Sequence, residues 1–293
     1  MPTLAANGIN MYYEETGSGT PILFLHEFAG DHRAWETQVR FFSRRYRCIV
    51  YAARGYPPSD VPEDVSSYSQ DIAVDDAKGV LDALKIDKAH ICGLSMGGYA
   101  AVLFGVKYPE RALSLMIGGC GYGSSSKPSD WYGELDELAD AFLKEGMKVK
   151  AEEYSIGPTR VQLQNKDPRG WEEFRAQFME HSALGAANTF KGVQKHRPNL
   201  LEMEKELSAV DVPALIMLGD EDTPAMEASL FMKQVMPRAA LEVLPRTGHA
   251  TNLEEPDRFN RSLLEFISAV DAGRWEPRDP RSKSESLIKP LKD

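Results

Sequence analysis

The chain has 293 residues, 42% of them hydrophobic, and a formal net charge of −10 at pH 7, so it can bury a large core as one domain, with or without an insertion. The acidic balance argues against extended contact with nucleic acid or an anionic membrane, because both partners require clustered lysine and arginine. We therefore expect a small-molecule partner, and neither a nucleic-acid nor a membrane partner.

The first residues and the cysteines bear on cellular location. Residues 1–17 contain no basic region followed by an apolar stretch, and no apolar run approaches the roughly 18 residues of a membrane-spanning helix. Cys48, Cys92 and Cys120 each lie in or beside an apolar run, and their odd number suits buried, reduced thiols better than a disulfide framework. These features predict a cytoplasmic protein.

Six short apolar runs predict strands that are covered on both faces, as in a parallel sheet. These runs are residues 20–27, 46–53, 89–95, 113–119, 213–220 and 240–245. Between them, apolar side chains recur at helical spacing. The clearest cases are Val74, Ala77, Leu81 and Leu84 in one segment, and Phe259, Leu263, Phe266, Ile267 and Val270 in another. The alternation of strands and helices predicts a doubly wound α/β sheet.

The alternation is interrupted once, after the fourth apolar run. The next strand begins about ninety residues later, which is too long for a loop, and the intervening sequence has helical spacing. Its apolar positions include Trp131, Leu135, Leu138 and Phe142 in one stripe, and Trp171, Phe174 and Phe178 in another. We expect a helical cap over the carboxyl edge of the sheet, where ligands bind in open α/β folds. The alternative is that these stripes only extend the main core.

The chain is thus predicted to have four parts. Residues 1–122 form the first part of an α/β core, 123–210 the helical cap, and 211–270 the second part of the core. Residues 271–293 are charged and contain proline, so we expect a flexible tail with little fixed structure.

A candidate nucleophile lies at the end of the third apolar run, just before the predicted helix. Ser95 is flanked by Gly93 and Gly97 in a Gly-x-Ser-x-Gly pattern. A sharp strand-to-helix turn would project the hydroxyl above the sheet, and its cramped backbone leaves room only for glycine on either side. The pattern alone is weak evidence, but the predicted strand and helix around it supply the required context. The alternative is an ordinary turn serine.

A serine hydroxyl is a poor nucleophile at neutral pH, so a base must take its proton and an acid must orient that base. Two later strand ends supply candidates. Asp222 follows the fifth apolar run, and His249 follows the sixth. The alternative for His249 is an ordinary loop histidine.

The chain order Ser95, Asp222, His249 is that of the α/β-hydrolases, and the sequence resembles that superfamily over nearly all of residues 8–270. The resemblance rests also on "RGYPPSD", "GDED" and "GHATNLEEPDRF". It implies an α/β-hydrolase fold with an inserted helical cap. It also selects Asp222, because the acid of the family lies three residues after a strand-ending glycine. Asp220 and Glu221 remain the alternatives.

The segment "HEFAG", residues 26–30, first raises the question of a metal site. A zinc interpretation requires His-Glu-x-x-His, but the next histidine after His26 is His32, so we expect no metal. By resemblance, the segment replaces the family's His-Gly-x-x-Gly, whose backbone supplies one donor to an oxyanion hole. The resemblance therefore implies Phe28 N–H and Met96 N–H as the two donors.

Glu27 stands where the family has glycine. A carboxylate aimed into the oxyanion hole would oppose the negative charge of the transition state. We expect Glu27 to turn into the fold and brace the loop, through backbone N–H groups or a basic partner such as Arg54. In the alternative, Glu27 orients water or binds an amine of the substrate.

The resemblance implies acyl transfer through a covalent ester on the serine, with no cofactor. We expect a small, largely apolar carboxylic ester as substrate, with His26, Glu27, Trp131 and His181 as candidate binding residues. His181 continues the second cap stripe, so it is alternatively a core or interface histidine. His32, His90 and His196 are expected at the surface. Other candidate functions are a lactonase, a carbon–carbon bond hydrolase, a lyase that uses the triad only as a base, and a slow-turnover ligand sensor.

Overall fold

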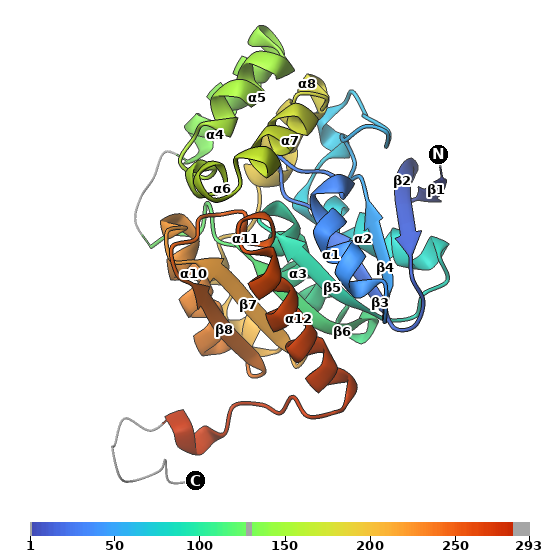
Figure 1. Cartoon of the computed structure of the whole chain (residues 1–293), viewed down its shortest axis with the longest axis vertical. Coiled ribbons are helices and arrows are strands. Elements are labelled where there is room, and N and C mark those ends of the chain that lie inside the picture. The colour runs from blue at the N-terminus through green and yellow to red at the C-terminus, as the bar shows by residue number, and fades with distance from the viewer. Residues whose placement is uncertain (1, 127–130, 284–293) are drawn as a thin grey trace.

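A mostly parallel eight-stranded sheet forms the centre of the molecule, in the order β1-β2-β4-β3-β5-β6-β7-β8. The computed structural model describes residues 2–126 and 131–283 (Figure 1). The strands are β1 (Thr3–Ala6), β2 (Ile9–Thr16), β3 (Pro21–Leu25), β4 (Arg47–Tyr51), β5 (Ala89–Leu94), β6 (Ala112–Gly118), β7 (Ala214–Gly219) and β8 (Ala239–Leu244). Only β2 is antiparallel to its neighbours, β1 and β4. The predicted doubly wound α/β fold is confirmed.

Each of the six predicted runs overlaps one of the strands β3 to β8 to within one residue. The sequence analysis missed β1 and β2 at the edge of the sheet. Most of their residues are exposed or only partly buried, so neither strand has the continuous apolar character that marked the others.

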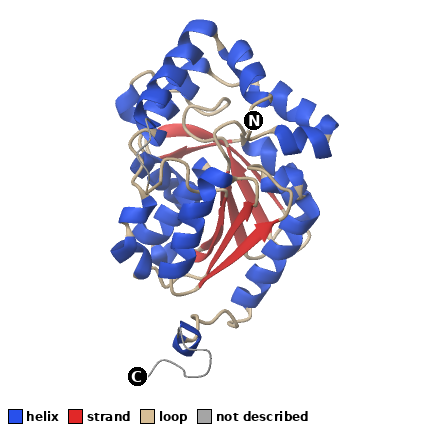
Figure 2. Cartoon of the chain, turned by 90° about the vertical axis from the view of Figure 1, so that its left-hand side faces the viewer, coloured by secondary structure: helices blue, strands red, loops and turns tan. Residues whose placement is uncertain are grey.

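Helices cover both faces of the sheet (Figure 2). Alternate side chains of each strand point to opposite faces of the sheet. On one face, Leu23 and Leu25 pack with α2 (Gln70–Ala83), α3 (Met96–Lys107) and α10 (Thr223–Val235). Ile22 and Phe24 pack with α1 (Glu36–Phe42) and α12 (Pro256–Asp271). The two predicted apolar stripes lie on α2 and α12 and face the sheet, as expected.

Between β6 and β7 the chain forms the helical insert. Its helices are α4 (Trp131–Glu145), α5 (Met147–Ser155), α6 (Val161–Lys166), α7 (Pro168–Phe178) and α8 (Ala183–Asn188), followed by a π-helical turn (Thr189–Gln194) and the short α9 (Glu204–Ser208). We call α4 to α8 the cap helices. They lie together at one end of the sheet (Figure 1). They share an aromatic cluster with Phe28, which belongs to the loop after β3.

One predicted cap position is wrong. Leu138 is 39% exposed, whereas Leu135, Ala139 and Phe142 are buried. These three residues have the spacing i, i+4 and i+7 of one helix face, and Leu138 lies beside that face. The stripe on α7 is buried as predicted, with Trp171, Phe174 and Phe178 all in the cap cluster.

The segment after α12 differs from the predicted flexible tail. Trp275 packs against Phe266 with ring centroids 4.7 Å apart, and its indole N–H donates to the carbonyl of Arg238 at 2.8 Å. The backbone N–H of Arg278 donates to Pro237 O. One large aromatic side chain thus anchors this charged segment to the core; residues 284–293 lie outside the described part.

The three cysteines are free and buried, as predicted. Among the described residues, no helix combines the length and the apolar character needed to cross a membrane.

Candidate active site

Ser95 lies on a strained turn between β5 and α3. Its backbone has φ 54° and ψ −112°, a conformation that is costly for a residue with a side chain and typical of functional sites. Its N–H donates to the carbonyl of Gly118 at the end of β6, at 2.7 Å. The serine is therefore fixed against the neighbouring strand, at the carboxyl edge of the sheet.

The two flanking glycines are required by close backbone contacts. A Cβ atom at Gly93 would lie 2.0 Å from the carbonyl oxygen of Gly97, and one at Gly97 would lie 2.1 Å from the carbonyl oxygen of Leu25. Both distances are far below van der Waals contact. The steric reason given for the Gly-x-Ser-x-Gly pattern therefore applies to this turn.

The structure brings Asp222 to His249 and leaves the two alternative acids elsewhere. Asp222 Oδ2 lies 2.9 Å from His249 Nδ1, and both side chains are buried. Asp220 accepts a hydrogen bond from the backbone of Thr247, and Glu221 accepts one from the side chain of Gln162. Only Asp222 is therefore placed to orient the imidazole.

The carboxylate also controls the protonation of the histidine. Burial works to lower the pKa of His249, but the charge of Asp222 and its hydrogen bond prevail, and the pKa is raised above its ordinary value. An imidazole in this state accepts a proton more readily, as a general base must.

Two residues that the sequence analysis missed support this pair. Tyr122 donates its hydroxyl to Asp222 Oδ1 at 3.0 Å, and its ring lies 5.0 Å from the ring of His249. Glu254 accepts hydrogen bonds from the backbone N–H groups of Gly248 and Ala250 at 2.6 and 3.0 Å, which fixes the loop on both sides of the histidine. The sequence could have indicated Tyr122, because this residue lies just beyond a buried strand, at the edge where the other site residues lie.

Ser95 and His249 both lie close to the end of β6. Ser95 is bonded to Gly118, and a Cβ atom on the next residue, Gly119, would lie 3.4 Å from His249 Cε1. Within the described residues, no hydrogen bond joins the Ser95 hydroxyl to the His249 ring. Catalytic hydrogen bonds of this kind often tighten only in the complex with substrate.

The two backbone donors implied for the oxyanion hole have no hydrogen-bond acceptor within the described part of the chain. Neither Phe28 N–H nor Met96 N–H donates to another described group. Met96 is the first residue of α3, where N–H groups have no intrahelical acceptor. The hydroxyl of Tyr56 donates to the carbonyl of Phe28 at 3.0 Å, which fixes the peptide that follows Phe28.

Glu27 turns into the fold, but not toward the partner that the sequence suggested. Its carboxylate forms a fully buried ion pair with Arg160, the residue before α6. The predicted partner, Arg54, instead pairs with Asp76 at 2.8 Å. The sequence could not identify Arg160, because it lies 133 residues further along the chain.

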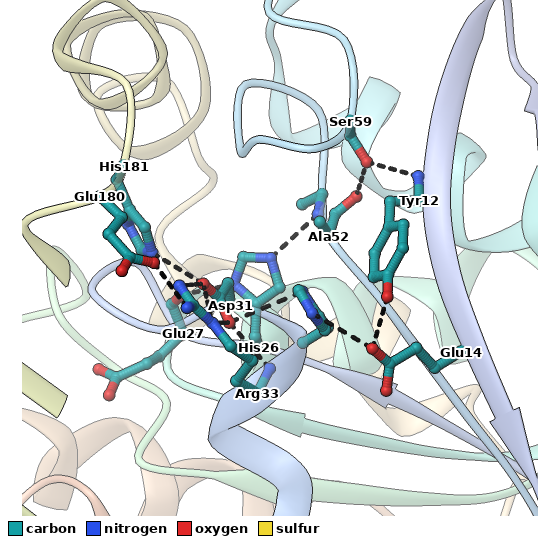
Figure 3. A network of polar contacts seen from close by, with 12 residues as sticks. Tyr12, Glu14, His26, Glu27, Asp31, Arg33, Ala52, Ser59, Glu180 and His181 are labelled. Carbon is teal, nitrogen blue, oxygen red and sulfur yellow. Dashed lines mark hydrogen bonds and ion pairs between the residues drawn. The ribbon is translucent and has the colours of Figure 1, made fainter. Parts of the chain in front are cut away.

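Both ring nitrogens of His26 are hydrogen-bonded to backbone groups, and its substrate-binding role stays a prediction. Its Nδ1 lies 2.7 Å from the carbonyl oxygen of Glu27, and its Nε2 accepts the N–H of Ala53 at 3.0 Å (Figure 3). Burial lowers the pKa of His26 to about 4, so the ring is neutral. It therefore ties the loops after β3 and β4 together.

His181 joins the cap to the core, which agrees with its interface alternative. Its Nε2 lies 3.2 Å from Asp31 Oδ2 (Figure 3). Burial works against the charge of Asp31, yet hydrogen bonds from His181 and Arg33 hold the pKa of that carboxyl below its ordinary value. Arg33 also pairs with Glu180, at 2.6 Å.

The remaining predicted positions are less informative or wrong. Trp131 begins α4, but its side chain lies outside the described part of the chain, so its substrate-binding role stays a prediction. His32 and His90 are buried, contrary to expectation. His32 packs edge-on against Tyr12, and both ring nitrogens of His90 have polar partners, so tertiary contacts cover them. His196 is exposed, as predicted.

A small cavity of about 40 Å³ lies beside Met96. Apolar and aromatic side chains form most of its wall, among them Tyr56, Tyr68 and Val193. It lies beside Met96 and Gly97, the first residues of α3.

Comparisons with known proteins identify the family of the chain. The model of the alpha/beta hydrolase fold family matches residues 20–256. The chain is 30% identical to a 2-hydroxy-6-oxononadienedioate/2-hydroxy-6-oxononatrienedioate hydrolase of Burkholderia vietnamiensis, over 88% of this chain and 91% of that protein. It is 26% identical to the 3-oxoadipate enol-lactonase 1 of Acinetobacter baylyi, over 85% and 89% of the two chains.

Solved structures show the same relationship. A thermophilic esterase from Thermogutta terrifontis superposes with a TM-score of 0.81 at 26% identity, covering 92% of this chain and 98% of that chain. The chain belongs to the α/β-hydrolase-fold family. It is a hydrolase of this fold that acts on small molecules.

Proposed function

We propose that the chain is a serine hydrolase that cleaves a small, largely apolar carboxylic ester through an acyl-enzyme. His249 takes the proton of the Ser95 hydroxyl, whose oxygen attacks the ester carbonyl. Asp222 orients the imidazole and stabilises its cation. The N–H groups of Phe28 and Met96 stabilise the oxyanion. The alcohol leaves with the proton, and water then releases the acid by the same steps, without a cofactor.

One observation carries the proposal. A serine held at φ 54° lies at the same sheet edge as a buried Asp222–His249 pair 2.9 Å apart. Strain at a position without a packing role is expected where the chemistry needs the side chain exposed. The aromatic cluster around Phe28 supports an apolar acyl group.

The second candidate is a lactonase or a carbon–carbon bond hydrolase. It is favoured by the relatives, since one is named as an enol-lactonase and the other as a hydrolase of an oxo-dienedioate. The same serine, histidine and oxyanion donors would serve either reaction. The two candidates differ only in the group that follows the carbonyl.

The test is a substrate screen with wild type and Ser95→Ala. The panel holds p-nitrophenyl esters of increasing chain length, simple lactones and vinylogous diketones. We expect ester hydrolysis by wild type, and a loss of kcat of at least about 10³-fold in Ser95→Ala, with an unchanged circular dichroism spectrum. Ser208→Ala, at an exposed position on α9, is the matched control and should retain activity.

Other outcomes would separate the remaining candidates. Hydrolysis confined to lactones or diketones would favour the second candidate over the ester. Cleavage without release of an acid would indicate a lyase, and ligand binding with turnover far below about 1 s⁻¹ would indicate a sensor. Full activity in Ser95→Ala would contradict the nucleophile assignment.

A further inference from the structure

A buried ion pair joins the predicted oxyanion loop to the cap. Glu27 precedes Phe28 in the loop after β3, and Arg160 precedes α6. The side chains are 2% and 0% exposed. Two charges are rarely removed from water without a specific use, because their desolvation is costly even when they are paired.

Glu27 occupies the place beside Arg160 that the carboxylate of a ligand would take. The guanidinium lies over the rings of Tyr154 and Phe174, at 5.3 and 4.7 Å from the centroids. Its remaining polar contacts are with Glu27 and the carbonyl of Thr159. An arginine fork between aromatic rings is suited to one carboxylate, and here the protein itself supplies that carboxylate.

The pair is incompletely hydrogen-bonded. Glu27 Oε1 and Arg160 Nε are buried and have no hydrogen-bond partner among the described residues. Native proteins satisfy nearly all such groups, so each exception requires a reason. A pair with one spare acceptor and one spare donor is less tightly specified than a fully bonded one.

The pair also lies close to the reacting groups. Glu27 is adjacent in sequence to Phe28, whose N–H is a predicted oxyanion donor. Burial and Asp222 dominate the pKa of His249, but Glu27 also raises it and Arg160 lowers it. Both charges therefore act on the imidazole, and their effects are opposed.

We propose that Glu27 determines the charge selectivity of the acyl site, because it neutralises Arg160 and thereby favours uncharged acyl groups. With Glu27 in place, Arg160 is already paired and is closed to a carboxylate on the acyl chain of a substrate. This inference rests on the proposed hydrolase function. It predicts that removal of Glu27 converts Arg160 into a carboxylate receptor.

The kinetic test uses two substrates of similar length, ethyl hexanoate and monoethyl adipate, which differ by one terminal carboxylate. Wild type should prefer ethyl hexanoate. In Glu27→Gly the side-chain volume beside Arg160 is vacated, and the ratio of kcat/KM should shift toward monoethyl adipate by about tenfold or more. Glu27→Gln, which keeps the shape but not the charge, should shift the ratio in the same direction by less.

Two control variants separate charge selectivity from general effects. Glu15→Gln removes one negative charge from a pair with Arg47 on β2 and β4, and Glu180→Gln removes a contact between the same loop and the cap. Both should leave the substrate ratio unchanged. A role of Glu27 in folding alone would lower kcat/KM for both substrates equally.

The binding test needs no catalysis. In a Ser95→Ala background, acetate should raise the melting temperature of Glu27→Gly in a saturable manner, should have little effect with Glu27 intact, and should lose its effect when Arg160→Met is added. If no ester is hydrolysed by wild type, the proposed function fails and this test alone decides the inference. If Glu27→Gly does not fold, Glu27→Gln decides it through the kinetic ratio.

The inference is overturned by either of two results. One is an unchanged substrate ratio in both Glu27 variants. The other is acetate stabilisation that is equal with and without Glu27, or that persists after Arg160→Met.

Discussion

Two buried pairs each join a carboxylate to a basic side chain. They differ in how completely their polar atoms are hydrogen-bonded. In the Asp222–His249 pair at the ends of β7 and β8, both carboxylate oxygens have partners, His249 Nδ1 at 2.9 Å and the Tyr122 hydroxyl at 3.0 Å. In the Glu27–Arg160 pair between core and cap, one oxygen and one nitrogen have no partner among the described residues.

The difference indicates different uses of a buried carboxylate. A fully bonded carboxylate is over-determined in position, so it can hold an imidazole in one tautomer and one orientation. An incompletely bonded one is held mainly by its charge, so it is positioned less strictly, but losing its partner leaves a charge buried. We therefore expect the first pair to determine the reaction rate and the second to determine stability and selectivity.

The largest effect is expected from Asp222→Asn. The amide cannot stabilise the imidazolium and favours the wrong tautomer, so kcat should fall by about 10³- to 10⁴-fold in the ester assay, with the fold retained by circular dichroism. Asp220→Asn and Glu221→Gln are matched controls on the same turn, and each should change kcat less than threefold. A larger loss in either control would reassign the acid.

Asp222→Asn should also change the pH dependence of the activity. His249 acts as a base only when neutral, so activity is lost as pH falls through its pKa. Burial lowers that pKa and Asp222 raises it to a net value above the ordinary one. Removing the negative charge should therefore move the acid limb of the kcat/KM profile to lower pH. The shift is measured on the activity that remains in Asp222→Asn.

A smaller but still large effect is expected from Arg160→Met on stability. The change leaves the Glu27 carboxylate buried without its cation, which typically costs about 3–5 kcal/mol, measured by urea unfolding at neutral pH. Adding Glu27→Gln should restore more than half of the loss, because no charge then remains buried. Additive losses in the double variant would show that the two side chains are not energetically coupled.

The two pairs also differ in how far the sequence could predict them. Ser95, Asp222 and His249 each follow a predicted strand within a few residues, so strand prediction and the topology of parallel sheets place them at one edge. Arg160 has no such local constraint, and its partner is fixed only by the packing of the cap on the core. For the same reason the sequence suggested Arg54 for Glu27. The burial of His32 and His90 likewise depends on tertiary contacts that no local pattern shows.

The smallest effect is expected from a third pair, at the rim between the same loop and the cap. The side chains of Arg33 and Glu180 are 35% and 63% exposed, so water and salt screen their interaction. Glu180→Gln should therefore cost less than about 1 kcal/mol in urea unfolding, and the difference from wild type should shrink further in high salt. If this variant lost as much stability as Arg160→Met, burial would not be what makes the Glu27–Arg160 pair important, and the cap would instead depend on its rim contacts.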